Sequence, residues 1–153
     1  MPKFMKNKIR GGRASTTLAL AAIFIFALVV RILPSFDIVF SDPVKYSSDD
    51  GIYHMRLVEN MLLGGHGRIY FDPFTNFPYG SYMHFTPLFD WIIAAAVWIV
   101  SLGNPTFEII NKIAPFIPAI MGAGLAFPVY FLCKAIFKSK KAAFFAAFLA
   151  VIS

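Results

Sequence analysis

The stretch "IAPFIPAIMGAGLAFPVYFLC", from Ile113 to Cys133, decides the class of fold. It holds 21 consecutive residues without a charge, and about 20 apolar residues are enough for a helix to cross a bilayer. Its three prolines are tolerated better in a bilayer helix, because neighbouring helices re-satisfy the freed carbonyl groups. Gly122 and Ala126 have the spacing of small residues at close contacts between membrane helices. The stretch therefore predicts a transmembrane helix, which we extend to residues 108–134.

The composition of the whole chain agrees with a membrane protein. Of its 153 residues, 58% are hydrophobic and 14% are charged, whereas a soluble domain has about 45–50% and about 25%. The net charge of +6 collects in residues 1–13 and 135–141, which flank apolar runs, as is typical of cytoplasmic anchoring. We therefore expect membrane lipid, and no nucleic acid, as a partner. The single cysteine, Cys133, supplies neither a disulfide framework nor a multi-cysteine zinc site.

Two more apolar runs predict membrane helices at the ends of the chain. Residues 14–34 begin with 17 uncharged residues from Ala14 to Val30, near the lower limit of a membrane span. No small-x-small cleavage site follows them, which favours an uncleaved helix over a signal peptide. Residues 142–153 stop after twelve residues, too few to cross. We interpret them as the start of a cut-off third helix, and the chain as an N-terminal fragment or a truncated reading frame.

The topology follows from the charges. Residues 1–13 and 135–141 both lie in the cytoplasm, as the positive-inside rule expects, only if residues 87–102 do not span the membrane. Asp90 supports this choice, because a carboxylate at mid-bilayer costs about 2.5–3.5 kcal/mol. Residues 87–102 are therefore predicted to be an interfacial or re-entrant helix. Residues 35–107 become one large external loop of a multi-pass protein of the cell membrane.

Inside that loop, residues 50–63 predict a short amphipathic helix. Apolar residues recur there at helical spacing, and Gly64-Gly65 follow as a stop signal; the apolar positions are Ile52, Met55, Val58 and Leu62. Arg56 and Glu59 stand three apart and would most simply form a surface ion pair. The segments "SDP", "GGHG", "FDPF" and "FPYGS" predict turns.

Asp49 and Asp50 are the first candidates for chemistry. Two adjacent carboxylates repel, and a hard divalent cation, which prefers oxygen ligands and accepts phosphate, is one way to relieve the repulsion. Helix N-termini also attract phosphate. The plainer alternative is helix capping by Ser47, Ser48 or Asp50, with an acidic first turn that suits the helix dipole. His54 lies four residues after Asp50 and could join a metal site, although a lone helical histidine is more often simply hydrogen-bonded.

Two quoted stretches resemble a known enzyme family. "DGIYHMRLVENML" followed by "RIYFDPFTNFPYGSYMHFTPLFDWII" is similar to the first external loop of the catalytic subunit of oligosaccharyltransferases, most closely the single-subunit archaeal kind. The resemblance implies a C-type glycosyltransferase fold, with N-terminal transmembrane helices in an all-α membrane protein. It also implies transfer of an oligosaccharide from a dolichyl phosphate or pyrophosphate carrier to the asparagine of Asn-X-Ser/Thr in acceptor proteins.

The resemblance assigns roles to individual residues. It implies that Asp50 is catalytic and a ligand of Mn²⁺ or Mg²⁺, because the family's aspartate stands six residues before its arginine, here Arg56. By their position in the loop, Asp49, His54, Arg56 and His84 are further candidates for contacts around the metal or with substrate. The other metal ligands and the W-W-D motif that reads the acceptor are expected beyond Ser153, so the fragment alone should be inactive.

Two alternatives stay open at the level of sequence. One is another membrane glycosyltransferase that uses a polyprenyl phosphate carrier, such as a protein mannosyltransferase, which also has acidic residues in its first external loop. The other is a non-enzymatic transporter or assembly fragment. Transporters usually have polar residues within their spans, whereas residues 113–133 contain none that ionise.

Overall fold

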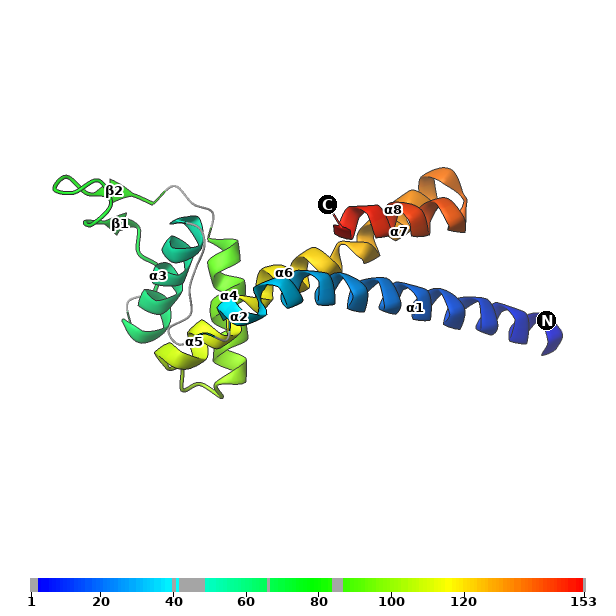
Figure 1. Cartoon of the computed structure of the whole chain (residues 1–153), viewed down its shortest axis with the longest axis horizontal. Helices are drawn as coiled ribbons and strands as arrows, with labels where there is room; N and C mark the ends of the chain where they lie inside the picture. The colour runs from blue at the N-terminus through cyan, green and yellow to red at the C-terminus, as the bar shows by residue number, and fades with distance from the viewer. Residues whose placement is uncertain (1–2, 40, 42–48, 66, 84–86, 153) are drawn as a thin grey trace. The chain divides into compact units, whose positions relative to one another are not determined.

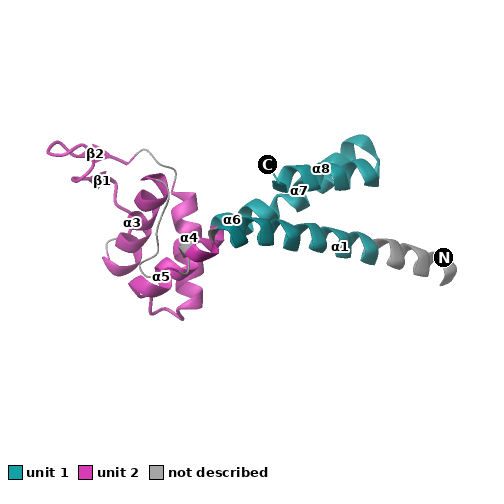
Figure 2. Cartoon of the chain, in the orientation of Figure 1, with its two compact units in different colours: residues 1–35, 118–153 teal, residues 36–117 magenta. Residues whose placement is uncertain are grey.

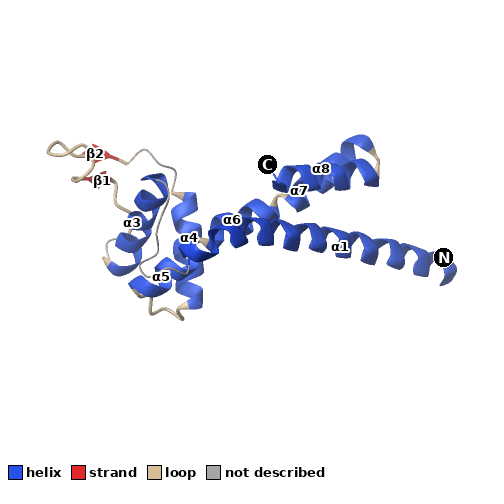
Figure 3. Ribbon diagram, viewed as in Figure 1, coloured by secondary structure: helices blue, strands red, loops and turns tan. Residues whose placement is uncertain are grey.

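The computed structural model describes residues 3–39, 41, 49–65, 67–83 and 87–152. These residues are mostly helical, as the sequence predicts (Figure 1, Figure 3). The chain divides into two compact units, residues 1–35 with 118–153 and residues 36–117 (Figure 2).

Three helices build the core of the unit that covers residues 36–117. They are α3 (Asp49–Leu63), α4 (Leu88–Val100) and α5 (Phe107–Ile113), and a short α2 (Phe36–Val39) precedes them. The sequence predicts the first of these over residues 50–63. Met55, Val58 and Leu62 of its apolar stripe pack against α4 and α5, whereas Ile52 is exposed. Burial of that stripe holds the three helices together, through a cluster made of Met55, Val58, Ile93, Ala94, Val97, Ile110 and Ala114.

A small hairpin in this unit departs from an all-α fold. Strand β1 (Phe71–Asp72) pairs antiparallel with β2 (Ser81–Tyr82), with Phe71 opposite Tyr82 and Asp72 opposite Ser81. The sequence predicts only turns here, since two-residue strands are too short to show an alternating pattern. Gly80 has a φ of +71°, and a Cβ at this position would lie 2.3 Å from the Phe71 ring. The hairpin therefore depends on a glycine at position 80.

In the other unit, residues 1–35 with 118–153, helices pack against one another largely through small side chains. Here α1 (Lys3–Ile32) contacts α7 (Ala126–Phe137) and α8 (Lys140–Ile152). Small residues let helix backbones approach closely, and the buried set is Leu20, Ala27, Ala123, Ala126, Tyr130, Ala143, Ala147 and Val151. Gly122 lies against α1, because a Cβ there would be 2.8 Å from Arg31 Nε. Arg31 in turn donates a hydrogen bond to the Val151 carbonyl.

Within the described chain, two stretches are long and apolar enough to cross a membrane, Ala14–Ile32 and Phe107–Phe137. Helices α1 and α8 begin earlier than the predicted residues 14 and 142, because Lys and Arg, which precede both apolar runs, are good helix formers. The predicted span at residues 108–134 is not one continuous helix. It is α5, α6 (Phe116–Gly124) and α7 in succession.

Prolines explain where this second stretch is interrupted. Pro118 and Pro128 stand four residues after Ala114 and Gly124, and a proline cannot donate to the carbonyl four residues before it. The chain tightens there instead: the N–H of Ile117 donates to the Ala114 carbonyl at 3.1 Å. The helix therefore breaks one turn before each of these prolines.

Candidate functional site

Asp49 and Asp50 occupy the first turn of α3, and both are exposed. The helix begins at Asp49, so Asp50 lies inside the first turn. It is therefore not the N-cap residue, which was one of the alternatives that the sequence leaves open. Ser47 and Ser48, the other capping candidates, lie outside the described residues. A carboxylate in a first turn is favourable, since the N–H groups there have no intrahelical partner and carry the positive end of the helix dipole.

The first turn of α3 carries two carboxylates that a metal site could use. Two carboxylates are the oxygen ligands that Mn²⁺ and Mg²⁺ accept, so the donor chemistry fits. Among the described residues, no group of three or more His, Cys, Asp or Glu side chains gathers where an ion could be held. His84, a sequence candidate, lies outside the described residues. Asp49 and Asp50, which are adjacent in this turn, are therefore too few by themselves to complete such a site.

His54 turns toward α4. Its Nδ1 lies 2.6 Å from Asp90 Oδ1, and its ring meets the Phe89 ring edge-on, with the centroids 5.1 Å apart. Asp90 is only 1% exposed, so its carboxylate is part of the interior of this unit. Its second oxygen, Oδ2, is buried and has no hydrogen-bond donor among the described residues. An unsatisfied buried polar atom costs about 1–3 kcal/mol.

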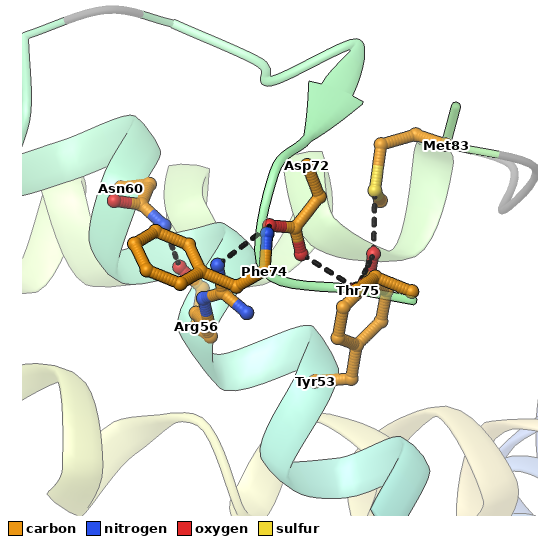
Figure 4. A network of polar contacts seen from close by, with 7 residues as sticks. All are labelled: Tyr53, Arg56, Asn60, Asp72, Phe74, Thr75 and Met83. Atoms are coloured by element: carbon orange, nitrogen blue, oxygen red, sulfur yellow. Dashed lines mark hydrogen bonds and ion pairs between the residues drawn. The ribbon is translucent and has the colours of Figure 1, made fainter. Parts of the chain in front are cut away.

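Arg56 connects α3 to the hairpin. Its Nη2 donates to Asp72 Oδ1 at 2.7 Å, and its guanidinium lies 5.1 Å from the centroid of the Phe74 ring (Figure 4). The ion pair between Arg56 and Glu59 that the sequence predicts is therefore wrong, since Arg56 pairs with Asp72. The predicted partner is a neighbour on the same helix, whereas the observed one is brought up by the hairpin and is only 2% exposed.

The environment of Asp72 explains its ionisation. Burial opposes the charged form, but three groups donate to the carboxylate and outweigh it: the Phe74 N–H at 3.0 Å, the Thr75 hydroxyl at 2.8 Å and Arg56. Together they hold the pKa of Asp72 below its ordinary value. The sequence predicts only a turn at "FDPF". The signal that was available is an aspartate whose side chain can accept hydrogen bonds from residues two and three positions ahead.

Tyr53 completes the face of α3 that contacts the hairpin. Its hydroxyl donates to Met83 Sδ at 2.7 Å and lies 3.5 Å from the oxygen of the Thr75 hydroxyl, which donates its proton to Asp72 (Figure 4). Tyr53 and Arg56 stand three apart, on one side of the helix. Helix α3 thus has one face on the hairpin and another, with His54, on α4. Both faces lie within two turns of Asp50.

A model of the family described as "Oligosaccharyl transferase STT3, N-terminal" matches residues 18–153. Dolichyl-phosphooligosaccharide-protein glycotransferase 3 of Archaeoglobus fulgidus is 39% identical over 138 residues, which are 87% of this chain and 15% of that protein. Dolichyl-monophosphooligosaccharide–protein glycotransferase AglB of Haloferax volcanii is 32% identical over 117 residues, 75% of this chain and 11% of that protein. The chain thus spans less than a sixth of the length of either relative.

Solved structures give the same picture. Archaeal oligosaccharyltransferase AglB from Archaeoglobus fulgidus, in complex with an inhibitory peptide and a dolichol-phosphate, matches with a TM-score of 0.79 and 35% identity. The match covers 92% of this chain and 16% of that one. The complex of the Archaeoglobus fulgidus oligosaccharyltransferase with Zn and sulfate matches with a TM-score of 0.77 and 38% identity, over 88% of this chain and 16% of that one.

Proposed function

Because this chain belongs to the oligosaccharyl transferase STT3 family, we propose that the protein containing it transfers a lipid-linked oligosaccharide to the asparagine of Asn-X-Ser/Thr. The observation that carries the proposal is the family match over residues 18–153, which includes Asp50 and both faces of α3. Family membership favours this activity over a protein mannosyltransferase and over a non-enzymatic transporter or assembly fragment.

The ligands of the relatives suggest the donor and the acceptor. The AglB structure contains a dolichol-phosphate and an inhibitory peptide, which correspond in kind to a lipid carrier and an acceptor segment. In the proposed reaction, the bond between the anomeric carbon of the sugar and the carrier phosphate oxygen breaks. The amide nitrogen of asparagine bonds to that carbon and gives up one proton, which passes to water. Negative charge therefore collects on the leaving phosphate.

Asp50 is the residue that we assign to this chemistry. A divalent cation, when bound, supplies positive charge opposite the leaving phosphate, and the Zn in a relative's structure supports a metal at such a site. We propose Mn²⁺ or Mg²⁺ as the ion and the Asp50 carboxylate as one ligand. The exposed position of Asp50 leaves it accessible to an ion and to ligands from elsewhere in the protein. Asp49, about 100° around the helix, has the lesser role of favouring the helix N-terminus.

We propose a multi-pass arrangement in the cell membrane. Residues 1–13 and 135–141 lie in the cytoplasm, and residues 35–107 lie on the external face, where a lipid-linked donor and an acceptor protein can meet. Trp91 and Trp98 support an interfacial position for α4. Each is 52% exposed, and tryptophan is enriched at membrane–water interfaces.

The test compares Asp50→Ala with Asp49→Ala in the natural protein, with any residues that precede or follow this chain. Transfer from a dolichyl-linked oligosaccharide to an Asn-X-Thr peptide is measured across a Mn²⁺ titration. Asp50→Ala should lose most transfer while its folding is intact, because an exposed carboxylate contributes little to packing. Asp49→Ala should be mild. Loss in Asp49→Ala alone would mean that the other carboxylate is the ligand, and full activity in both would remove the metal from this loop.

A further inference from the structure

The proposed reaction gives no role to the His54–Asp90 pair. Asp90 lies in the first turn of α4, 1% exposed, and its Oδ1 is 2.6 Å from Nδ1 of His54, which is 20% exposed. The pair joins α4 to α3 one turn after Asp50, because residues i and i+4 are neighbours on one side of a helix.

This pair is a poor choice if its only purpose is stability. It borders the apolar cluster of Met55, Ile93 and Ala94, and Asp90 Oδ2 is buried without a donor among the described residues. Replacing a buried polar or charged pair by apolar side chains of similar volume is often neutral or stabilising. Two leucines would fit that description here. The pair therefore needs a reason other than packing energy.

The position of the pair supplies that reason. In the first turn of α3, Asp49, Asp50 and Ile52 are exposed, so they make few contacts that could fix the helix end. Helix ends with few buried contacts open more readily than helix centres. His54 and its neighbour Tyr53, about one turn after Asp50, hydrogen-bond to other elements. The bond to Asp90 also fixes direction, which an apolar contact does not.

We propose that His54 and Asp90 are a positioning pair that holds the first turn of α3, and hence the Asp50 carboxylate, in the orientation needed to bind a divalent cation. The inference rests on the proposed role of Asp50 as a ligand. Partners that orient metal ligands without touching the metal typically change metal affinity by about 10–100-fold when they are mutated. Because this pair acts through one turn of helix, the effect should be at the lower end of that range.

The experiment uses four variants of the natural protein in detergent. Asp90→Leu and the double variant His54→Leu with Asp90→Leu remove the bond. Asp90→Asn keeps an oxygen that can accept from His54. Glu108→Gln is the matched control, since it removes the exposed Glu108–Lys112 pair of another helix in the same unit.

Two measurements do not depend on turnover. Mn²⁺ affinity is measured by electron paramagnetic resonance of the free ion, and the melting temperature is measured in EDTA. The two leucine variants should bind Mn²⁺ about tenfold more weakly, and the double variant, which replaces both partners, should do so with a melting temperature that is unchanged or raised. Their losses should be equal, because either change breaks the same bond. Asp90→Asn and Glu108→Gln should bind Mn²⁺ like the wild type.

Hydrogen exchange gives a readout that needs no metal. The amides of Tyr53 and His54 donate to first-turn carbonyls in a helix, so they should exchange faster in Asp90→Leu, while the amide of Leu62 does not change. Unchanged affinity and unchanged exchange in the leucine variants would overturn the inference. The inference would also be overturned if the loss of Mn²⁺ affinity paralleled a fall in melting temperature and occurred in Asp90→Asn as well. If the wild type binds no Mn²⁺, the proposed role of Asp50 fails, and exchange still decides whether the pair holds the first turn.

Discussion

Replacing Arg56 by methionine tests how the hairpin is held on α3. The substitution keeps the apolar stem of the side chain and removes the charge that faces Asp72. Asp72 is 2% exposed and would keep only the Phe74 N–H and the Thr75 hydroxyl as donors. Breaking a buried ion pair from one side costs about 3–5 kcal/mol. Because the Arg56 side chain is 37% exposed, we expect a loss near the lower end, about 3 kcal/mol.

The converse change should cost less. Asp72→Asn removes the buried charge and lets Arg56 turn toward water, so the expected loss is that of weakened hydrogen bonds to a charged group, about 1.5 kcal/mol. The decisive result is therefore which of the two variants, Arg56→Met or Asp72→Asn, loses more stability. It distinguishes an uncompensated buried carboxylate from a simple loss of contacts.

Hydrogen exchange at the Met83 amide measures this loss where it occurs. That amide donates to the Tyr70 carbonyl at 2.9 Å, so it is protected only while the hairpin is closed. A loss of about 3 kcal/mol should speed its exchange by about a hundredfold or more. Lys112→Met, which breaks the exposed pair with Glu108 and leaves the hairpin contacts in place, is the control and should not change the exchange of the Met83 amide. Equal effects of Arg56→Met and Asp72→Asn, or an Arg56→Met effect no larger than the control, would refute the reasoning.

Three further predictions concern the same two units. The pKa of Asp72 is lowered in the folded protein from its ordinary value of 3.8, so its contribution to stability is present at neutral pH and lost as the pH falls through the folded-state pKa; Asp72→Asn should flatten the acid limb of a denaturation profile, and an unchanged limb would contradict this. Gly80→Ala should destabilise the hairpin by about 1–2 kcal/mol, the cost of a positive φ for a residue with a Cβ, and should displace the Phe71 ring in nuclear magnetic resonance spectra; unshifted ring signals would count against it. A cysteine at Ser139, with Cys133 changed to serine, should react with a membrane-impermeant maleimide only from the cytoplasmic side, and labelling only from outside would mean that residues 87–102 span the membrane.

The helices of this chain are largely predictable, and the reason is local. The apolar stripe of α3 and the uncharged runs of α1 and of residues 113–133 are repeated signals, each read over many residues. The interruptions near Ala114 and Leu125 are also encoded locally, by Pro118 and Pro128, but a proline does not say whether a membrane helix bends or breaks. That depends on the neighbours that re-satisfy its carbonyls.

The polar contacts are not predictable in the same way. Arg56 has an acidic neighbour three residues away and an acidic partner sixteen residues away, and only the hairpin decides between them. Asp90 lies in a run of apolar residues, where a carboxylate suggests a boundary, yet it is buried because His54 meets it from another helix. Both outcomes come from tertiary contacts. Asp50 shows the opposite case, since its assignment rests on the resemblance in sequence and the described residues alone do not complete a metal site around it.

The most direct test of this account is to incubate the natural protein with a dolichyl-linked oligosaccharide, Mn²⁺ and a peptide that contains Asn-X-Thr, and to locate the sugar on the product by mass spectrometry. The account predicts the intact oligosaccharide on the asparagine side chain, with loss of the product when EDTA is added or when Asp50 is alanine. Sugar on the threonine hydroxyl would indicate a protein mannosyltransferase or a related enzyme. Transfer to asparagine that is unaffected by both EDTA and Asp50→Ala would contradict the role that we assign to this loop.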